Sequence, residues 1–254
     1  MNANETVTVL LAELTGDHRT DRIADLISDD YWEHLDSPVG PYDRFVGPSG
    51  FDYGTGYAVA RTIVDGDRVL THALIKTPGQ PDLVGVDLWK LRGGQVTERW
   101  SSRVPRVSET ASGRSQLDGT AAPDGSSDYR ASMRIVSDWT RTVLLGADFS
   151  AVPRFISDRS YEQHNPDVAD GIDGFAAATA KLRAAGLSFD YQTIDLMIAE
   201  DDFVFTRGQG NLGQPVIFND IWRLDGGKIV EHWDVVSPRA EVADVARTLH
   251  SVGR

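Results

Sequence analysis

Apolar residues in the second half of the chain recur first with a helical period and then with the alternation of strands. Residues 129–145 carry apolar side chains three or four positions apart, which predicts an amphipathic helix. Two more helices are predicted at 149–156 and at the alanine-rich stretch 172–185. Alternating segments then predict an antiparallel meander of four strands, at 189–198, 203–210, 215–224 and 229–236. This order indicates an α+β domain in which the helices cover one face of a curved sheet.

The first half shows the same order of patterns in a shorter form. Helical spacing predicts helices at 7–14 and 22–27, and strands follow further along. Residues 37–56, rich in Gly, Pro and Asp, stand where the third helix would be. This half therefore looks like a trimmed version of the second.

Matching segments indicate that the chain is an internal duplication. Asp87–Ser101 aligns with Asp220–Asp234 at a constant offset of 133, and seven of these 15 positions are identical. Upstream, Ile27–Asp29 matches Ile156–Asp158 in the same order along the chain. Ordered repeats predict two copies of one fold. We therefore expect two tandem α+β domains, each a curved antiparallel sheet covered by N-terminal helices.

The composition changes sharply between the two copies. Residues 107–127 are small, polar and without periodicity, which predicts a flexible linker. The expected domains are residues 1–106 and residues 128–254.

Charge and composition narrow the class of partner. The chain has 254 residues, a net charge of −13, 41% hydrophobic residues and no cysteine. Such a negative charge argues against nucleic acid and against anionic membrane surfaces as partners. No apolar run reaches the roughly 20 residues of a membrane helix, and the first 15 residues show no signal peptide. We expect a cytoplasmic protein that binds a small molecule or another protein.

Strand parity in the last hairpin groups three ionisable side chains. A three-residue loop at 225–227 would pair Asp220 with His232 and place Asp234 on the same face. A two-residue loop would separate the three, so the longer loop is the prediction, and the glycine pair 226–227 can supply it as a turn plus bulge. Phe218 and Trp222 share the face and make it apolar.

Two carboxylates and an imidazole on an apolar face suit acid–base chemistry. Burial moves the pKa values of Asp and His toward neutrality, where proton transfer is efficient. The alternative is that Asp220 and His232 merely pair across the strands. Tyr161 and His164 could line the mouth of a pocket, and the alternative is a loop histidine bonded to backbone. No metal is predicted, because the histidines and acids show no ligand spacing.

The second copy resembles the SnoaL-like polyketide cyclases, within the nuclear transport factor 2-like superfamily that includes ketosteroid isomerase. The resemblance lies in the segments Tyr161–Pro166 and Asn219–Asp234 and covers residues 128–237, while residues 6–105 match weakly. It implies that the two copies are tandem cone-shaped α+β barrels. It also implies a pocket between the sheet and the helices, with Phe218, Trp222 and Phe175 as its apolar wall.

The family also implies roles for the three polar residues. Asp234 falls at the acid–base position of an intramolecular aldol closure that needs no cofactor, with His232 two residues before it. Asp220 falls at a second polar position, where the cyclases have histidine. The first copy has Arg99 and Ser101 in place of His232 and Asp234, so an ion pair between Arg99 and Asp87 is expected to close its site.

The expected function is that of a cyclase or isomerase acting on a hydrophobic carbonyl compound. An epoxide-opening enzyme on the same fold and a non-catalytic small-molecule-binding protein are the alternatives. The first copy is expected to pack on the second as a pseudo-dimer without activity of its own, and a higher oligomer is compatible with the sequence. A cavity of roughly 300 Å³ or more that contains Asp220, His232 and Asp234 would favour small-molecule chemistry.

Overall fold

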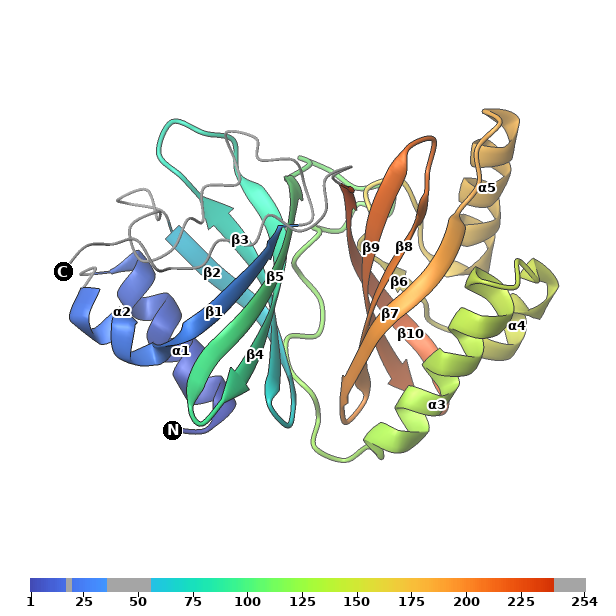
Figure 1. Cartoon of the computed structure of the whole chain (residues 1–254). Helices are drawn as coiled ribbons and strands as arrows, with labels where there is room; N and C mark the ends of the chain where they lie inside the picture. The colour runs from blue at the N-terminus through green and yellow to red at the C-terminus, as the bar shows by residue number, and fades with distance from the viewer. Residues whose placement is uncertain (17–19, 36–55, 240–254) are drawn as a thin grey trace.

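The computed structural model describes residues 1–16, 20–35 and 56–239, which form two α+β halves (Figure 1). The first half comprises α1 (Ala3–Thr15), α2 (Thr20–Leu26), β1 (Ile27–Leu35), β2 (Gly56–Asp65), β3 (Arg68–Lys76), β4 (Leu83–Arg92) and β5 (Gln95–Pro105). The second half comprises α3 (Tyr129–Trp139), α4 (Val152–Phe155), β6 (Glu162–Gln163), α5 (Gly171–Ala184), β7 (Asp190–Glu200), β8 (Phe203–Asn211), β9 (Pro215–Asp225) and β10 (Lys228–Pro238). A π-helical turn at Thr140–Leu144 extends α3, and a 3₁₀ turn at Phe149–Ala151 precedes α4.

Side-chain caps fix where the first helix of each half begins. The Asn2 side chain accepts a hydrogen bond from the Glu5 backbone N–H at 2.9 Å, and the Glu5 carboxylate accepts one from the Asn2 N–H at 2.8 Å. This reciprocal pair is a capping box. The Asp128 side chain caps α3 by accepting from the Arg130 N–H at 3.0 Å.

The two sheets share one topology, which supports the predicted duplication. Their strand orders are β1-β5-β4-β3-β2 and β6-β10-β9-β8-β7. In each sheet the first strand of the half runs parallel to the last, and the other neighbours are antiparallel. The sequence patterns predicted the four-stranded meanders but not the parallel edge strands β1 and β6.

The predicted elements are present in the described residues, with small differences at their ends. The segment 37–56, expected to replace a helix, lies almost entirely outside the described residues, which resume at residue 56. Within the described ranges, no helix is long and apolar enough to cross a membrane.

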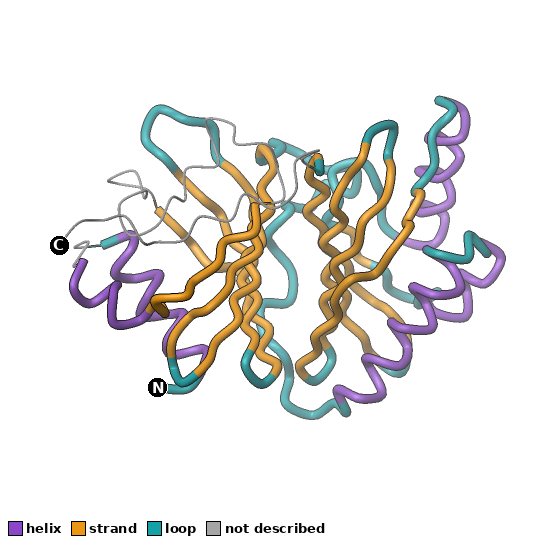
Figure 2. Tube along the Cα trace, in the orientation of Figure 1, coloured by secondary structure: helices purple, strands orange, loops and turns teal. Residues whose placement is uncertain are grey.

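Each sheet packs on helices with one face and on the other half with its second face (Figure 2). In the second half, Trp139 of α3 and Trp222 of β9 belong to the core under the helices. A separate core joins the halves, with Ile63 and Leu70 from the first half packed near Phe205 and Trp233 from the second. Burial of these side chains gives the two halves a shared hydrophobic interface.

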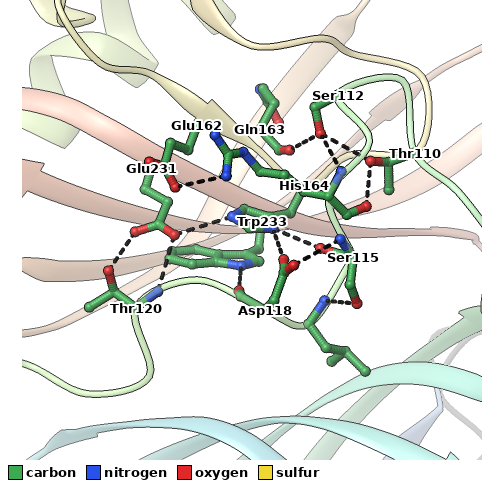
Figure 3. Close-up of polar contacts among 12 residues, drawn as sticks. Thr110, Ser112, Ser115, Asp118, Thr120, Glu162, Gln163, His164, Glu231 and Trp233 are labelled. Atoms are coloured by element: carbon green, nitrogen blue, oxygen red, sulfur yellow. Dashed lines mark hydrogen bonds and ion pairs between the residues drawn. The ribbon is translucent and has the colours of Figure 1, made fainter.

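Residues 107–127, here called the strap, run between the halves and contain no helix or strand. The strap differs from the expected flexible linker because both sheets hold its backbone. The Arg61 guanidinium of β2 donates to the carbonyl oxygens of Leu117 and Asp118 at 3.0 and 2.7 Å. Trp233 Nε1 of β10 donates to the same Asp118 carbonyl at 2.9 Å (Figure 3). Composition predicts the lack of regular structure, but not these contacts.

Replacing Arg61 by Met should loosen the strap, because Met keeps an alkyl chain but donates no hydrogen bond. We expect the free energy of unfolding to fall by about 2 kcal/mol and trypsin to cleave faster after Arg114, within the strap. Urea unfolding and timed proteolysis measure the two effects. The control is Arg141→Met, whose side chain is 73% exposed. Equal cleavage rates in both variants would contradict the role of Arg61.

Candidate active site

The hairpin between β9 and β10 sets which side chains face the helices. Gly226 and Gly227 adopt positive φ angles of 55° and 76°, as a two-residue hairpin turn requires. A β-bulge between Ile229 and Glu231 then shifts the register of β10 by one residue.

The predicted three-residue loop is therefore wrong, although the predicted face is right. Asp234 lies opposite Asp220, and His232 lies opposite Trp222. The extra residue of the bulge restores the alternation that a two-residue turn would have broken. Asp220, His232 and Asp234 thus share one face, and one ligand atom from each lies within 4.8 Å of the others.

Asp220 and His232 form a buried hydrogen-bonded pair beneath the helices. The His232 Nε2 atom lies 3.2 Å from Asp220 Oδ1, and the residues are 6% and 1% exposed. The Tyr191 hydroxyl of β7 donates to Asp220 at 3.1 Å. Burial and the Asp220 carboxylate raise the pKa of Tyr191 well above its ordinary value, so the phenol stays a neutral donor. The Trp222 ring stacks on the imidazole, with centroids 4.0 Å apart.

Gln163 of β6 holds the other side of the imidazole. Its Oε1 atom lies 3.1 Å from His232 Nδ1 and also accepts from the Asn165 backbone N–H at 3.3 Å. Its Nε2 atom donates to the Tyr161 hydroxyl at 2.8 Å. The Asn165 N–H can donate only to the oxygen of the Gln163 amide, so it is this oxygen that faces His232 Nδ1. Asp220 faces Nε2, and each ring nitrogen of His232 therefore lies beside an acceptor. The ring is positioned from both ends.

Asp234 is the member of the group that reaches a cavity. The Asn165 side-chain amide donates to its Oδ2 atom. Burial raises the pKa of Asp234 to about 6, and the Asp220 carboxylate adds to the rise, while His232 and Asn165 oppose it. A carboxyl group in this range can both take up and release a proton near neutral pH.

The cavity beside Asp234 has a volume of about 380 Å³. It lies between β9, β10 and α5, and its wall is mostly apolar. The apolar lining includes Val168, Leu182, Phe189, Leu212, Val216 and Val236. Asp234 and Asn165 line the cavity, whereas Asp220 and His232 lie behind them and do not. The volume meets the expectation for a small-molecule site, but only one of the three predicted polar residues lines it.

The residues predicted to bind substrate form the core beside the cavity instead of its lining. The Phe218 ring stacks on Tyr191 with centroids 3.9 Å apart, and Trp222 contacts Trp139 edge to face. Phe175 is half-buried and packs on Phe189, which does line the cavity. Tyr161 is buried in the same core. These rings thus support the lining without being part of it.

His164 lies on the opposite side of the sheet, so the prediction that it lines the pocket mouth is corrected. Its Nδ1 atom lies 2.7 Å from the Ser115 carbonyl of the strap, and its Nε2 atom lies 3.2 Å from Glu231 (Figure 3). The ring stacks on Trp233 with centroids 4.8 Å apart. This is the alternative of a loop histidine bonded to backbone, and it serves the contact between the halves.

Sequence reasoning missed Asn165, Gln163 and Tyr191. Asn165 and Gln163 stand inside the Tyr161–Pro166 segment that was singled out, so their signal was available. Tyr191 carried none, because its contact with Asp220 depends on the pairing of β7 with β8 and of β8 with β9.

The first half contains the counterpart of this site with two decisive differences. The Tyr57 hydroxyl donates to Asp87 at 2.6 Å, and Trp89 Nε1 donates to Thr71 at 3.1 Å. In the second half Tyr191 binds Asp220 in the same way, and Trp222 Nε1 donates to Thr206 at 3.0 Å. The supporting contacts are duplicated, whereas Arg99 and Ser101 replace His232 and Asp234.

The predicted ion pair between Arg99 and Asp87 is present, with Nε and Oδ1 3.7 Å apart and both side chains fully buried. Arg99 also binds Glu33 of β1, and Arg103 approaches Asp87 to 3.6 Å. Burial alone would raise the pKa of Asp87, but the two guanidinium groups outweigh it and hold the pKa below its ordinary value. Asp87 is therefore a poor proton acceptor near neutral pH.

Two groups of side chains have spacings that a metal ion could use. One is Asp220, His232 and Asp234; the other is Glu162, His164 and Glu231. In the first, the Tyr191 hydroxyl and the His232 ring already bind Asp220, so a metal would have to break these hydrogen bonds. In the second, Arg223 Nε lies 2.7 Å from Glu231 and Arg114 lies 3.4 Å from Glu162, so guanidinium charge already balances the carboxylates.

Residues 134–238 match the SnoaL-like polyketide cyclase family. This segment is a SnoaL-like domain. The match runs from within α3 to the end of β10 and includes Asp220, His232, Asp234 and Asn165. A comparison with curated proteins finds no match.

A comparison with solved structures matches three bacterial proteins, among others. IdmH from Streptomyces antibioticus is 16% identical over 41% of this chain and 92% of its own, with a TM-score of 0.32. TsrD from Streptomyces laurentii is 23% identical over 43% and 90%, with a TM-score of 0.33. An NTF2-like protein of unknown function from Cytophaga hutchinsonii is 14% identical over 41% and 92%, with a TM-score of 0.35. At these identities the chemistry of the site rests on its own residues.

Proposed function

We propose that the SnoaL-like domain performs acid–base chemistry without a cofactor on a hydrophobic carbonyl compound, with Asp234 transferring the proton. The observation that carries this proposal is the position of Asp234. Its carboxyl group has a pKa raised to about 6 and lies at the wall of a mostly apolar cavity of about 380 Å³. An enzyme that moves protons near neutral pH needs such a group. The family match supports chemistry of the cyclase or isomerase type.

The proposed reaction is an intramolecular aldol closure. The Asp234 carboxylate takes a proton from the carbon next to a carbonyl group, and the resulting enolate carbon bonds to a second carbonyl carbon of the same molecule. The carboxylic acid then returns its proton to the new alkoxide. Atoms and charge balance within substrate and Asp234, so no oxidant, reductant or metal is required.

His232 and Asp220 position Asp234 and tune its charge in this proposal. The imidazole is held between Asp220 and Gln163, and its positive charge when protonated opposes the rise in the pKa of Asp234. Asp220 is too deeply buried to touch a compound in the cavity. The first half, with Asp87 bound to guanidinium groups, serves as a packing partner without catalysis.

The test is exchange of hydrogen for deuterium at the methyl carbon of 2-acetylnaphthalene, followed by NMR in D₂O. We expect the protein to accelerate exchange, because the first step removes this kind of proton. The carboxylate is the active form, so the rate should rise with pH, level off above pH 7 and fall about tenfold between pH 7 and pH 5. Added EDTA should leave the rate unchanged.

A matched variant distinguishes exchange that is catalysed in the cavity from exchange that is catalysed by acid or base in the solvent. Val236→Trp fills the cavity while leaving Asp234 in place, so it should bind and exchange the ketone poorly. Exchange that is independent of both pH and this substitution would sink the proposal. The recessed positions of Asp220 and His232 favour one alternative, a non-catalytic binding protein, which predicts ketone binding without exchange.

A further inference from the structure

The cavity beside Asp234 is not built by the SnoaL-like domain alone. Val104 and Pro105, at the end of β5 in the first half, contribute to its wall, and so does Gln116 of the strap. The other lining residues come from the second half. The tandem arrangement therefore adds side chains that a single domain of this fold would have to take from elsewhere.

Gln116 is the polar residue among these additions, and its hydrogen bonding is incomplete. The residue is 3% exposed, and its Oε1 atom accepts from the Val107 backbone N–H at 2.8 Å. Its Nε2 atom is buried and has no hydrogen-bond partner among the described residues. A buried donor without a partner costs free energy that an acceptor on a bound molecule would recover.

The strap around Gln116 is fixed against the segment that carries Asn165. The Ala111 N–H donates to the Pro166 carbonyl at 2.9 Å, and the Ser112 hydroxyl donates to the Gln163 carbonyl at 2.6 Å. Arg114 Nη2 lies 2.9 Å from Asp170. Because these contacts are already made, little conformational entropy is lost when a ligand meets the Gln116 amide.

We propose that Gln116 is a specificity-determining residue, whose side-chain amide donates a hydrogen bond to a carbonyl oxygen of the compound in the cavity. The inference rests on the proposed function, because it concerns the same cavity and the same class of compound. In this inference the strap takes part in ligand recognition, because the Gln116 amide is a hydrogen-bond donor that belongs to neither sheet. The first half takes part through the lining residues that it adds to the cavity.

The test compares two probes of nearly the same shape, 2-acetylnaphthalene and 2-ethylnaphthalene, of which only the first has a carbonyl oxygen. Binding to the whole protein is measured by titration of ligand fluorescence or by calorimetry. We expect the wild type to bind the ketone about tenfold more tightly than the hydrocarbon. In Gln116→Leu the ratio should fall to about one, while affinity for the hydrocarbon is retained.

The matched control is Gln214→Leu, the same substitution at a second amide that lines the same cavity but is exposed to solvent. Water already satisfies that amide, so the preference for the ketone should persist. Gln116→Glu covers the case in which the Leu variant does not fold. It keeps an acceptor for the Val107 N–H, removes the donor, and should bind the ketone worse than the hydrocarbon.

The outcomes separate this inference from the proposed function. A ketone preference that survives in both Gln116 variants overturns the inference, whereas pH-dependent exchange through Asp234 would still stand. Loss of the preference in Gln214→Leu as well would also overturn it, because the donor would then not be specific. If the wild type binds neither probe, both the inference and the proposed ligand class are wrong.

Discussion

Replacing Asp234 by Asn should lower the rate of ketone exchange by about 10³-fold and at the same time stabilise the protein at alkaline pH. The amide cannot take up the proton, so the catalysed exchange is lost. The fold should persist, because the Asn165 amide can donate to the new side-chain oxygen as it does to Asp234 Oδ2. The same NMR experiment in D₂O measures the rate.

The gain in stability follows from the raised pKa. The pKa of Asp234 is about 6 in the folded protein, against an ordinary value of 3.8. The folded state thus binds this proton more tightly than the unfolded state does, and the ionised carboxylate destabilises the fold above pH 6. This cost is relieved as the pH falls and is absent below about 3.8. Asp234→Asn should therefore gain about 1–3 kcal/mol at pH 8 and close to nothing at pH 4.

Urea unfolding at the two pH values measures the difference. Asp167→Asn is the control, since Asp167 also lines the cavity but its side chain is 83% exposed. We expect it to change neither exchange nor stability appreciably. Undiminished exchange in Asp234→Asn would remove this residue from the mechanism, and equal stability at both pH values would show that its carboxylate is not strained by burial.

Local patterns in the sequence predicted the elements and the face that carries the site. Helical spacing and strand alternation depend on nearby residues, so 129–145 and the four strands of the second half could be placed without coordinates. The shared face of Asp220, His232 and Asp234 followed from strand parity. The reasoning reached the right face through a wrong loop, because the bulge after Ile229 leaves no signature in the residue types.

Contacts between distant segments could not be predicted in this way. Tyr161 and His164 flank the short strand β6, and His164 contacts the carbonyl oxygen of Ser115, which stands 49 positions before it in the sequence. The strap shows the same limit. Its composition predicts a lack of regular structure, but the donors that hold it, such as Arg61 and Trp233, stand far away in the sequence.

The two halves balance buried charge in different ways, and this difference separates the candidate active site from its counterpart. Asp87 and Glu33 face the guanidinium groups of Arg99 and Arg103, so two negative charges meet two positive ones. At the second site the carboxylates of Asp220 and Asp234 are grouped with the imidazole of His232 instead of a guanidinium group. Burial, to which the neighbouring Asp220 carboxylate adds, raises the pKa of Asp234 to about 6 and so favours binding of a proton. In the first half, the two guanidinium groups instead balance the buried carboxylates.

Arg99→Met should accordingly destabilise the protein strongly, by about 3–5 kcal/mol. The Arg99 side chain is fully buried, and its removal leaves the Asp87 and Glu33 carboxylates buried with less compensating charge. The control is Arg92→Met, whose side chain is 68% exposed and pairs with Asp30 at the surface. That substitution should cost less than about 1 kcal/mol.

A compensated variant tests the electrostatic cause directly. Adding Glu33→Gln and Asp87→Asn to Arg99→Met removes the buried negative charges, so urea unfolding should recover most of the lost stability. If the triple variant is as unstable as the single one, the loss comes from packing around Arg99 and not from unpaired charge. Recovery would show that Arg99 stabilises the first half by balancing the buried charges of Asp87 and Glu33.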